Sequence, residues 1–336
     1  MKNILVTGGA GFIGANFINY LINQTDDHIV NLDDLTYAAN KDNIEQQNSK
    51  QYTFVKGDIR DKEFLIQLFD KYQFCRVIHF AAESHVDNSI ADPSAFVETN
   101  ITGTFHLLHT AYQLWMDKPF QLKDDFKDAR FLHVSTDEVY GTLGSEGLFT
   151  EETPYAPNSP YSASKASSDF LVRSYFHTYG MPVVTTNCSN NYGPYQHDEK
   201  LIPVIIRKAL FGHNIPIYGD GKNIRDWLFV KDHCRGIDIA VNNGKLGETY
   251  NIGGKNEREN IYIARKICEM LDKWKPRDDR KSYKEQITFV EDRHGHDFRY
   301  AIDASKIENE LGWRAKENFE SGIEKTVRWY INKYTN

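Results

Sequence analysis

The chain has 336 residues, of which 40% are hydrophobic and 26% charged, a composition typical of a globular protein and far from a disordered one. Its formal net charge of -7 argues against a nucleic-acid-binding protein, which usually presents a basic face. The 4 cysteines form no C-x-x-C pair, so we expect no disulfide framework or zinc site, and a cytoplasmic location. No apolar run is long enough for a transmembrane helix, and we see no secretion leader.

The first predicted strand, residues 2–7, runs directly into a glycine-rich turn, Gly8-Gly9-Ala10-Gly11-Phe12-Ile13-Gly14, and apolar residues at helical spacing follow. Glycines at 9, 11 and 14 satisfy G-x-G-x-x-G, and glycines at 8, 11 and 14 satisfy a G-x-x-G-x-x-G variant. Between a strand and a helix, such glycines allow a tight turn, a close approach of the backbone to a pyrophosphate at the helix N-terminus, and close helix packing. The pattern therefore predicts a dinucleotide site.

The second predicted strand, residues 29–33, ends in Asp33, about 20 residues after the last glycine, where a ribose 2′-hydroxyl is held in dinucleotide-binding folds. An acid there repels a 2′-phosphate, and no arginine is adjacent to it in the sequence. This favours NAD over NADP. The alternative is a plain βαβ unit with an aspartate in a turn.

The alternation of strands and helices continues along the first half of the chain. We expect strands at 52–55, 77–80 and 131–136, a helix around 64–69, and a helix that begins at Asp92-Pro93 and runs to about Trp115. Ala81 and Ala82 after the fourth strand are small enough to let a cofactor approach the backbone. The pattern predicts an α/β fold with a doubly wound, parallel Rossmann sheet.

A hydroxyl and two carboxylates, Thr136, Asp137 and Glu138, follow the apolar strand 131–136. In open α/β sheets, ligands bind in the crevice outside the carboxyl ends of the strands. Two carboxylates in different surroundings can act as an acid and a base. The alternative is a polar loop in which Asp137 starts a turn and Glu138 faces water.

A long loop, 142–159, precedes a helix that opens at Ser159-Pro160 and carries Tyr161 and Lys165. Loops of that length are usually functional or mobile. The two side chains lie four residues apart and share one helix face. A nearby ammonium ion and a positive nicotinamide ring favour the phenolate, which can take a proton from a sugar hydroxyl. A surface Tyr/Lys pair is the alternative reading, and the preceding NAD signature disfavours it.

The second half is less regular. We expect a strand at 183–186, a polar loop at 187–194, a helix at 201–210, extended segments at 216–218 and 225–230, and helices at 232–242, after Asn260 and at 323–330. We predict an NAD-binding Rossmann domain over residues 1–189. Residues 190–336 should form mainly a smaller C-terminal α/β substrate domain, with some chain crossing back.

Two arginines of this half, Arg225 and Arg293, could clamp a substrate diphosphate, because a guanidinium binds phosphate oxygens through two parallel hydrogen bonds. The His294-Gly295-His296-Asp297 cluster could supply metal ligands. A hydride-transfer reaction needs no metal, however, so we expect none.

The glycine motif together with Tyr161-x-x-x-Lys165 resembles the extended short-chain dehydrogenase/reductase family of nucleotide-sugar enzymes. Within it, six stretches are similar to the dTDP-glucose 4,6-dehydratases, and the resemblance runs nearly end to end. The stretches are Ala81-Ala82-Glu83-Ser84-His85-Val86-Asp87, Ser135-Thr136-Asp137-Glu138-Val139-Tyr140-Gly141, Tyr161-Ser162-Ala163-Ser164-Lys165-Ala166-Ser167, Cys188-Ser189-Asn190-Asn191-Tyr192-Gly193-Pro194, Glu199-Lys200-Leu201-Ile202-Pro203 and Arg225-Asp226-Trp227-Leu228. The Thr-Asp-Glu run is the specific part, because related epimerases lack the Asp-Glu pair.

The resemblance implies a catalytic cycle. Tyr161, assisted by Lys165, removes the C4 hydroxyl proton while NAD takes the C4 hydride, and Thr136 hydrogen-bonds that hydroxyl. Glu138 then removes the C5 proton, Asp137 protonates the departing C6 hydroxyl, and the hydride returns to C6. The product is a 4-keto-6-deoxy sugar for deoxysugar biosynthesis of the rhamnose type.

The resemblance also implies binding residues and a homodimer formed through the long helices near 93–115 and 160–179. Membrane and nucleic-acid partners are not expected. The cofactor would contact Gly8, Gly11, Phe12, Ile13, Gly14, Asp33, Asp34, Leu35, Thr36, Asp58, Ile59, Ala81, Ala82, Ser84, Thr99, Tyr161, Lys165 and Asn191. The nucleotide sugar would contact Ser84, Thr136, Asn190, Lys200, Leu201, Pro216, Ile217, Tyr218, Arg225, Asn260, Arg293 and His296.

Three positions depart from the family pattern: Asn88 stands where an arginine is usual, Ala39 replaces a glycine, and His294 replaces a proline. None carries the expected chemistry, although His294 stands beside Arg293 and so bears on how the nucleotide is bound. The rival readings are another nucleotide-sugar dehydratase, a 4-epimerase, and a non-catalytic NAD-sensing protein on the same fold. An epimerase would not need Asp137 and Glu138, and a sensor could dispense with Tyr161 and Lys165.

Overall fold

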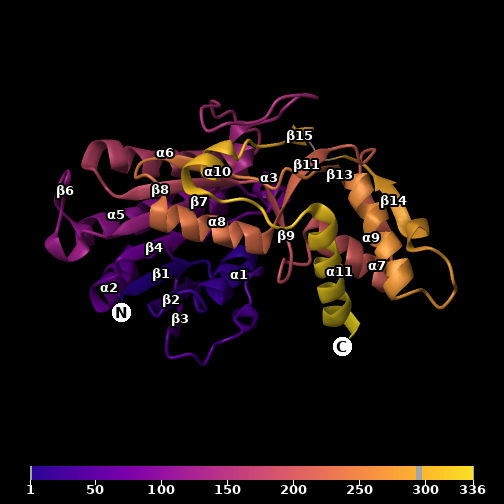
Figure 1. Ribbon diagram of the computed structural model, residues 1–336, viewed down its shortest axis with the longest axis horizontal. Helices are drawn as coiled ribbons and strands as arrows, with labels where there is room; N and C mark the ends of the chain where they lie inside the picture. Colours follow the sequence, from indigo (N-terminus) through magenta and orange to yellow (C-terminus); the bar gives the residue numbers. More distant parts are fainter. Residues whose placement is uncertain (1, 293–296, 336) are drawn as a thin grey trace.

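A seven-stranded sheet forms the centre of the computed structural model, which describes residues 2–292 and 297–335 (Figure 1). Every neighbouring pair of strands in it is parallel, as the sequence predicted. In spatial order the strands are β12 (Thr249–Ile252), β8 (Val183–Cys188), β7 (Arg130–Thr136), β4 (Arg76–His79), β1 (Asn3–Thr7), β2 (His28–Asp33) and β3 (Tyr52–Lys56). The order reverses between β1 and β4, the position at which doubly wound sheets bind ligands. The Rossmann fold is confirmed.

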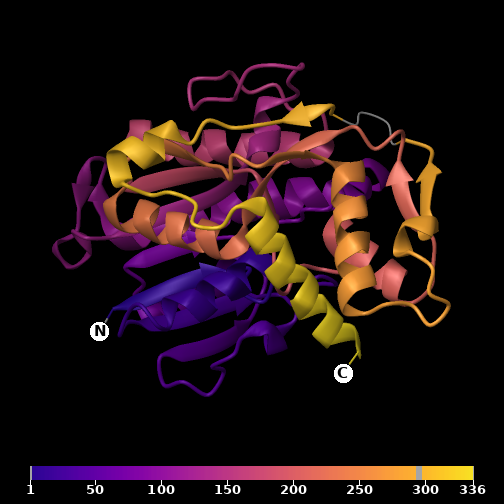
Figure 2. The same ribbon diagram turned by 45° about the vertical axis from the view of Figure 1, so that its right-hand side comes forward.

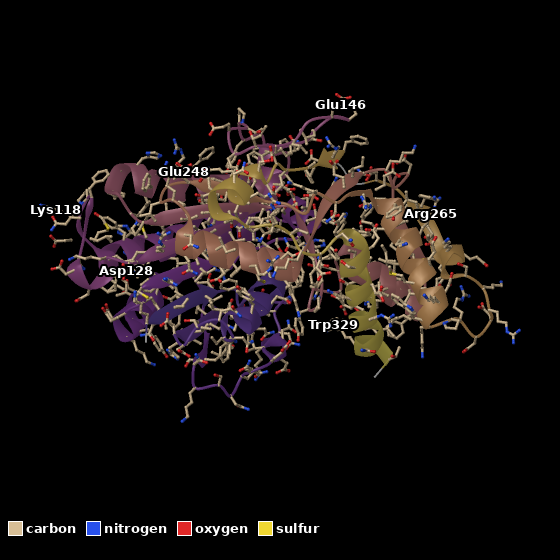
Figure 3. All side chains as sticks on the ribbon, viewed as in Figure 1. Lys118, Asp128, Glu146, Glu248, Arg265 and Trp329 are labelled. Atoms are coloured by element: carbon tan, nitrogen blue, oxygen red, sulfur yellow. The ribbon has the colours of Figure 1, made fainter. Side chains whose placement is uncertain are left out.

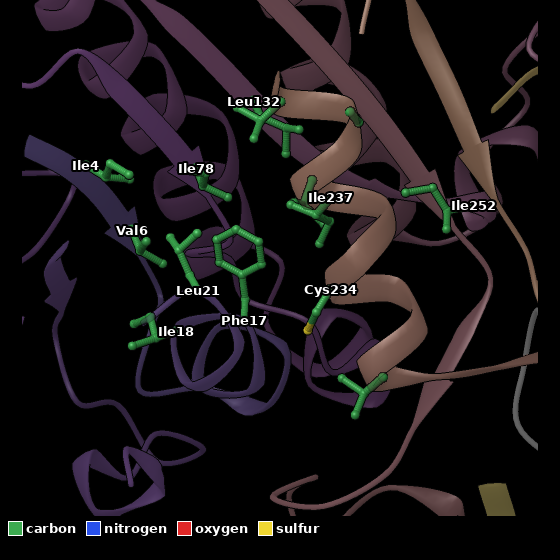
Figure 4. Packing of buried hydrophobic residues seen from close by; sticks show 14 of the residues in the cluster. Ile4, Val6, Phe17, Ile18, Leu21, Ile78, Leu132, Cys234, Ile237 and Ile252 are labelled. Atoms are coloured by element: carbon green, nitrogen blue, oxygen red, sulfur yellow. The ribbon is translucent and has the colours of Figure 1, made fainter. Parts of the chain in front are cut away.

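Helices cover both faces of the sheet, and this explains why its strands read as apolar runs. Successive residues of a strand point to opposite faces. Ile4 and Val6 of β1 therefore pack on one side with α1 (Phe12–Leu21) and α8 (Val230–Asn243), as Figure 4 shows. Leu5 faces the other side, where α2 (Lys62–Tyr72), α5 (Thr104–Trp115) and α6 (Pro160–Tyr179) lie.

Local sequence signals fix the ends of α6, the helix that carries Tyr161 and Lys165. Ser159 and Ser162 form a reciprocal capping box, and Pro160 occupies the first turn, where its missing N–H has no partner to lose. At the other end Gly180 adopts a left-handed conformation with φ of 70°, which terminates the helix. The helix therefore begins where the sequence predicted.

The helix expected from Asp92-Pro93 to Trp115 is present from Ser94 to Trp115, but its middle part is π-helical, which the sequence did not predict. A short helix α3 (Val86–Ala91) comes first, and α4 (Ser94–Phe96) begins after Pro93, its N-cap. A π-helical segment, Val97–Gly103, then joins α4 to α5. Within it, the Asn100 side chain accepts a hydrogen bond from Glu83 N and donates to Glu83 O, which ties the wider turn to the loop after β4. Such π segments are frequent at functional sites.

A second, smaller lobe lies beside the sheet and has its own apolar core (Figures 1 and 2). Its helices are α7 (Leu201–Leu210), α9 (Asn260–Trp274) and α11 (Phe319–Thr335). Its strands are β9 (Asn190–Tyr192), β10 (Ile215–Tyr218), β11 (Ile224–Phe229), β13 (Glu257–Glu259), β14 (Ile287–Val290) and β15 (Arg299–Tyr300). Between these elements the chain returns to the sheet three times, as α8, as β12 and as α10 (Ser305–Leu311).

Besides short 3-10 helices at Lys41–Asn43, Asp124–Phe126 and Tyr283–Gln286, the chain forms a small hairpin and the long loop 142–159. Strands β5 (Met116–Lys118) and β6 (Gln121–Leu122) form the hairpin after α5. The loop is tied to the chain around β15, since Leu143 pairs with Arg299 and Phe149 pairs with Ile302. The Arg299 guanidinium also donates to the carbonyls of Gly144 and Gly147. The loop therefore connects the two lobes.

In the described part of the chain, no helix has both the length and the apolar character needed to cross a membrane. The four cysteines are all free thiols, and three of them are buried.

Candidate active site

A cavity of about 380 Å³ lies at the carboxyl ends of the parallel strands. The segments that follow β1, β2, β3, β4, β7 and β8 all contribute to its wall. Parallel strands bring their carboxyl ends to one edge of the sheet, so residues distant in sequence meet there. All five expected catalytic residues line this one cavity: Thr136, Asp137, Glu138, Tyr161 and Lys165.

The glycine turn forms the end of the cavity at the N-terminus of α1. Gly8, Gly11 and Gly14 line it, whereas a Cβ on Gly9 would lie 2.3 Å from the Asn31 side chain, against β2. Gly8 has φ of 71°, and a Cβ there would lie 2.6 Å from Ala81 N. No side chain caps α1, so the N–H groups of its first turn remain available to an anion. These features fit a dinucleotide pyrophosphate.

Acidic residues line the cavity beyond the ends of β2 and β3. Asp33 accepts hydrogen bonds from Ala10 N (2.9 Å) and Leu35 N (2.8 Å), and so holds the glycine turn and the next loop together. Burial raises the pKa of this carboxyl. Arg60 also lines the cavity, a neighbour that the sequence analysis missed because it follows β3 and not β2. Its guanidinium forms ion pairs with Asp58 (2.6 Å) and Glu98 (3.3 Å).

Two carboxylates, Asp137 and Glu138, follow β7 in a turn of 3-10 helix, Asp137–Tyr140. Asp137 is buried, whereas Glu138 is half-buried. Asp137 is 1% exposed, and its Oδ2 atom has no hydrogen-bond partner in the described part of the chain. Burial, and then the neighbouring Glu138 and Asp226 carboxylates, raise the pKa of Asp137 well above its ordinary value, while Arg225 opposes this. This shift favours the protonated form of Asp137, in which the side chain can act as an acid.

Tyr161 and Lys165 project from the first two turns of α6, and both are buried. Burial, followed by the Glu138 charge, raises the pKa of the Tyr161 phenol, and a hydrogen bond from Thr136 lowers it. Lys165 Nζ donates to the Val134 carbonyl (2.9 Å), and burial lowers the pKa of this ammonium group. Lys165 alone does not make Tyr161 a phenolate at neutral pH. The positive charge of a bound nicotinamide ring is needed as well.

The structure brings nearly all the expected cofactor residues together. Gly8, Gly11, Phe12, Ile13, Gly14, Asp33, Asp34, Thr36, Asp58, Ile59, Ala81, Ala82, Ser84, Thr99, Tyr161, Lys165 and Asn191 line the cavity. Leu35 does not line it and contributes its N–H to Asp33.

The expected nucleotide-sugar residues divide between the cavity and the second lobe. Ser84, Thr136, Asn190 and Lys200 line the cavity, and Lys200 Nζ reaches across it to the Ser84 carbonyl (3.0 Å). The others lie away from its wall, in α7, β10, β11 and at the start of α9: Leu201, Pro216, Ile217, Tyr218, Arg225 and Asn260. Arg293 and His296, with His294, lie outside the described residues.

Two details bear on these residues of the second lobe. The side-chain oxygens of Asn190 and Asn260 are buried without a hydrogen-bond partner in the part of the chain that is described, which suits groups that receive a ligand. The Arg225 guanidinium lies 4.3 Å from the centre of the Tyr300 ring and donates to the carbonyls of Asp297 and Phe298.

Among the described residues, no group of three His, Cys, Asp or Glu side chains is arranged to hold a metal ion.

The sequence analysis missed part of the wall. Residues next to the predicted strand ends could have been found by extending each motif by one or two positions: Leu32, Gly57, Phe80, Glu83, Val134, Ser135, Cys188 and Ser189. No local signal marks Ala38, Ala95, Gln196 or His197, whereas Ala39 and Glu199 stood in stretches compared with the family but were not assigned to the site. Glu199 of the wall accepts a hydrogen bond from Tyr37 OH (3.2 Å), and Asn88, one of the residues that depart from the family pattern, donates to the same phenol oxygen (3.4 Å).

Comparisons with known proteins agree with this geometry. The family model described as GDP-mannose 4,6 dehydratase matches residues 5–326. A dTDP-glucose 4,6-dehydratase of Xanthomonas campestris pv. campestris (strain B100) is 55% identical over 100% of this chain and 95% of its own length. The chain belongs to this family of nucleotide-sugar 4,6-dehydratases.

Solved structures extend the comparison. The structure of the dTDP-glucose 4,6-dehydratase of Streptomyces venezuelae, which has NAD bound, is 43% identical to this chain and has a TM-score of 0.89. The alignment covers 99% of this chain and 98% of that one. A UDP-glucose 4-epimerase of Thermotoga maritima has a TM-score of 0.86 at 25% identity, with 99% of both chains covered. The 4,6-dehydratase family thus shares its fold with epimerases, and the fold alone does not distinguish the reactions.

The glycine turn gives a direct test of the dinucleotide site. In Gly8→Ala, the new Cβ would meet Ala81 N at 2.6 Å and the positive φ would be strained, so the turn must move. We expect the Kd for NAD, measured by isothermal titration calorimetry, to rise about tenfold or more, which corresponds to about 1.4 kcal/mol. Gly144→Ala is the matched control, because a Cβ there meets nothing within 4 Å. Equal NAD affinity in both variants would contradict this site.

Proposed function

We propose that this protein is an NAD-dependent dTDP-glucose 4,6-dehydratase that converts dTDP-glucose to dTDP-4-keto-6-deoxyglucose and water. The observation that carries the proposal is that Asp137, whose pKa burial raises, lines one cavity together with Glu138 and Tyr161. The family model is named for GDP-mannose, whereas the relatives that are 51–55% identical are named for dTDP-glucose. Full-length identity is the more specific indication, so we favour dTDP-glucose.

In the proposed cycle, the side chains of this chain move three protons. Tyr161, with Lys165 beside it on α6, takes the proton of the C4 hydroxyl, and Thr136 orients that hydroxyl. The 4-ketone acidifies C5–H, and Glu138 removes this proton and later returns it to C5. Asp137 gives its proton to the C6 hydroxyl, which leaves as water. The proton gained by Tyr161 balances the one lost by Asp137.

NAD, when bound, would accept a hydride from C4 and supply it again at C6, so no net oxidation results. The residues proposed to hold it are those of the glycine turn, with Asp33 and Asp58 near its ribose. Buried walls exclude water from the reacting carbons, which prevents loss of the unsaturated intermediate to side reactions.

We propose that the nucleotide part of the substrate extends from the cavity into the second lobe. The support is the pair of unpartnered amide oxygens of Asn190 and Asn260, together with the cation Arg225 next to Asp137. On this basis residues 1–189 act mainly as the NAD-binding domain and residues 190–336 mainly as the nucleotide-sugar domain.

We also propose a homodimer through the outer faces of α5 and α6. Phe105 on α5 is 38% exposed and Phe170 on α6 is 57% exposed, although both helices pack their other faces on the sheet. Large exposed aromatic side chains on adjacent helices are typical of an interface.

We place the enzyme in the cytoplasm, where its four free thiols stay reduced. A 4-keto-6-deoxy sugar is the precursor that reductases and epimerases need to make deoxysugars of the rhamnose type.

The reaction itself can be tested with dTDP-glucose that carries deuterium at C4. We expect loss of one water and recovery of the deuterium at C6, with no net NADH, when the product is followed by mass spectrometry and NMR. A galacto-configured product that keeps all its atoms would identify a 4-epimerase. If dTDP-glucose does not react and GDP-mannose does, the nucleotide assignment is wrong.

The acid and base roles predict different failures for different variants. Asp137→Asn and Glu138→Gln should lower kcat for water loss by about 10²–10⁴-fold, the usual contribution of a general acid or base, and leave NAD binding unchanged. In a single turnover both should still form reduced cofactor, seen by its absorbance, whereas Tyr161→Phe should not. Glu146→Gln makes the same chemical change at the exposed tip of the loop 142–159 (Figure 3) and should have no effect. Dehydration at the native rate by the first two variants would contradict the roles.

The dimer interface has its own test. Phe170→Asp places a charge on the exposed face of α6 and should shift the protein from dimer to monomer in sedimentation equilibrium, because a buried unpaired charge is costly. Phe289→Asp is the matched control, since Phe289 is 58% exposed on β14 of the other lobe. A dimer unaffected by Phe170→Asp would require a different interface.

A further inference from the structure

A carboxylate that the proposed cycle does not use lies behind the cavity, on the same helix as Tyr161 and Lys165. Asp169 is 5% exposed and stands four residues after Lys165, so the two side chains share one face of α6. Asp169 Oδ1 lies 3.0 Å from His133 Nε2. Its Oδ2 accepts hydrogen bonds from Ser135 Oγ (2.8 Å) and Tyr155 OH (2.9 Å). Burying a carboxylate costs free energy unless hydrogen bonds offset the cost, so a buried Asp169 with this many partners indicates a specific role.

The hydrogen bonds around Asp169 suit its ionised form. Ser135 and Tyr155 both donate to Oδ2, and with His133 as a third donor to Oδ1 the carboxylate acts only as an acceptor, as an ionised carboxylate does. His133 is neutral, because burial and then the charge of Lys165 hold its pKa well below the ordinary value. Its Nε2–H can then donate to Asp169. Burial raises the pKa of Asp169 to about 7, and the Lys165 ammonium is the first of the groups that oppose this rise.

Lys165 has few other sources of negative charge. The groups that face it are Asp169 on α6, Cys188 on β8, and the two buried histidines His79 on β4 and His133 on β7. Burial keeps the Cys188 thiol protonated by raising its pKa, and burial likewise keeps both imidazoles neutral. Lys165 Nζ itself donates to a main-chain carbonyl, that of Val134, which carries no full charge.

We propose that Asp169 is a positioning residue of the active site, whose buried carboxylate supplies the counter-charge that keeps Lys165 an ammonium ion beside Tyr161. The inference rests on the proposed function. Tyr161 and Lys165 together can lose one proton in two ways, from the phenol or from the ammonium group. A negative charge next to Lys165 favours loss from the phenol, which is the form that can take a proton from a substrate.

The same carboxylate connects the active site to the loop 142–159. Tyr155 of this loop donates to Asp169, and Asn187 at the end of β8 donates to the hydroxyls of both Tyr155 (3.2 Å) and Tyr140 (2.9 Å). Tyr140 in turn donates to Asn251 of β12. Of these neutral groups only Tyr155 contacts the carboxylate, and the others hold Tyr155 in place, so a substitution of Tyr155 removes a hydrogen bond to Asp169 without removing its charge.

The test compares the pH dependence of kcat in Asp169→Asn, Asp169→Glu and Tyr155→Phe. Loss of the counter-charge in Asp169→Asn should move the alkaline limb, where Lys165 loses its proton, down by about one to two pH units, the usual effect of a nearby opposite charge. Asp169→Glu keeps the charge and should restore the limb. Tyr155→Phe removes one donor but no charge, so its limb should stay in place. A limb that stays unmoved in a folded Asp169→Asn, as judged by its Tm, would overturn the proposal.

A second measurement needs no substrate. The ultraviolet absorption of the Tyr161 phenolate in the NAD-bound enzyme is obtained by subtracting the titration of the Tyr161→Phe variant. We expect this phenolate to form at a higher pH in Asp169→Asn than in the native enzyme, and at the native pH in Asp169→Glu and Tyr155→Phe. An unchanged phenolate titration in Asp169→Asn would overturn the role of Asp169. Failure of the native enzyme to convert dTDP-glucose would overturn the proposed reaction and leave this titration to decide on Asp169.

Discussion

Desolvation of ionisable side chains at one edge of a parallel sheet is the constraint on which this structure depends. Asp137, Tyr161 and Lys165 are all buried, and burial is the largest cause of the pKa shift of each. In water a carboxyl would be ionised and a phenol inert at neutral pH. Burial raises the pKa of the carboxyl toward the range of a general acid. It also strengthens the effect of each neighbouring charge on these pKa values, because buried charges are screened less. The chemistry thus follows from where the fold places ordinary side chains.

Helix α6 organises this edge. Its capped N-terminus places Tyr161 and Lys165 against the end of β7, and its next turn carries Asp169 against His133 and Ser135 of the same strand. The strand alternates, so the side chains of residues 133 and 135 face the helix. One helix therefore fixes the position, orientation and charge of the groups around the cavity, and a shift of α6 would alter all three together.

The second lobe contributes in a different way. It is built on its own apolar core, yet α8, β12 and α10 of the intervening chain pack on the central sheet. The loop 142–159 adds a further link through β15. The two lobes are thus joined by several crossings. The fold is shared with epimerases, so the fold alone does not assign the reaction, and it is the family model and the full-length relatives that show the 4,6-dehydratase family.

The sequence by itself determined the parallel sheet and the glycine turn, and it picked out Asp33 and the candidate catalytic side chains that the structure brings to one cavity, because strand and helix periodicity and the residues at strand ends are local signals. It also determined the start of α6, since a capping box and a proline are encoded within four residues. Only the tertiary structure decided which glycines face the cavity, that Arg60 and Glu199 join its wall, that the helix near residue 100 widens into a π segment, and that β12 returns to the sheet. The pKa shifts and the surroundings of Asp169 were equally out of reach. These features depend on contacts between distant segments, and a local pattern carries no information about them.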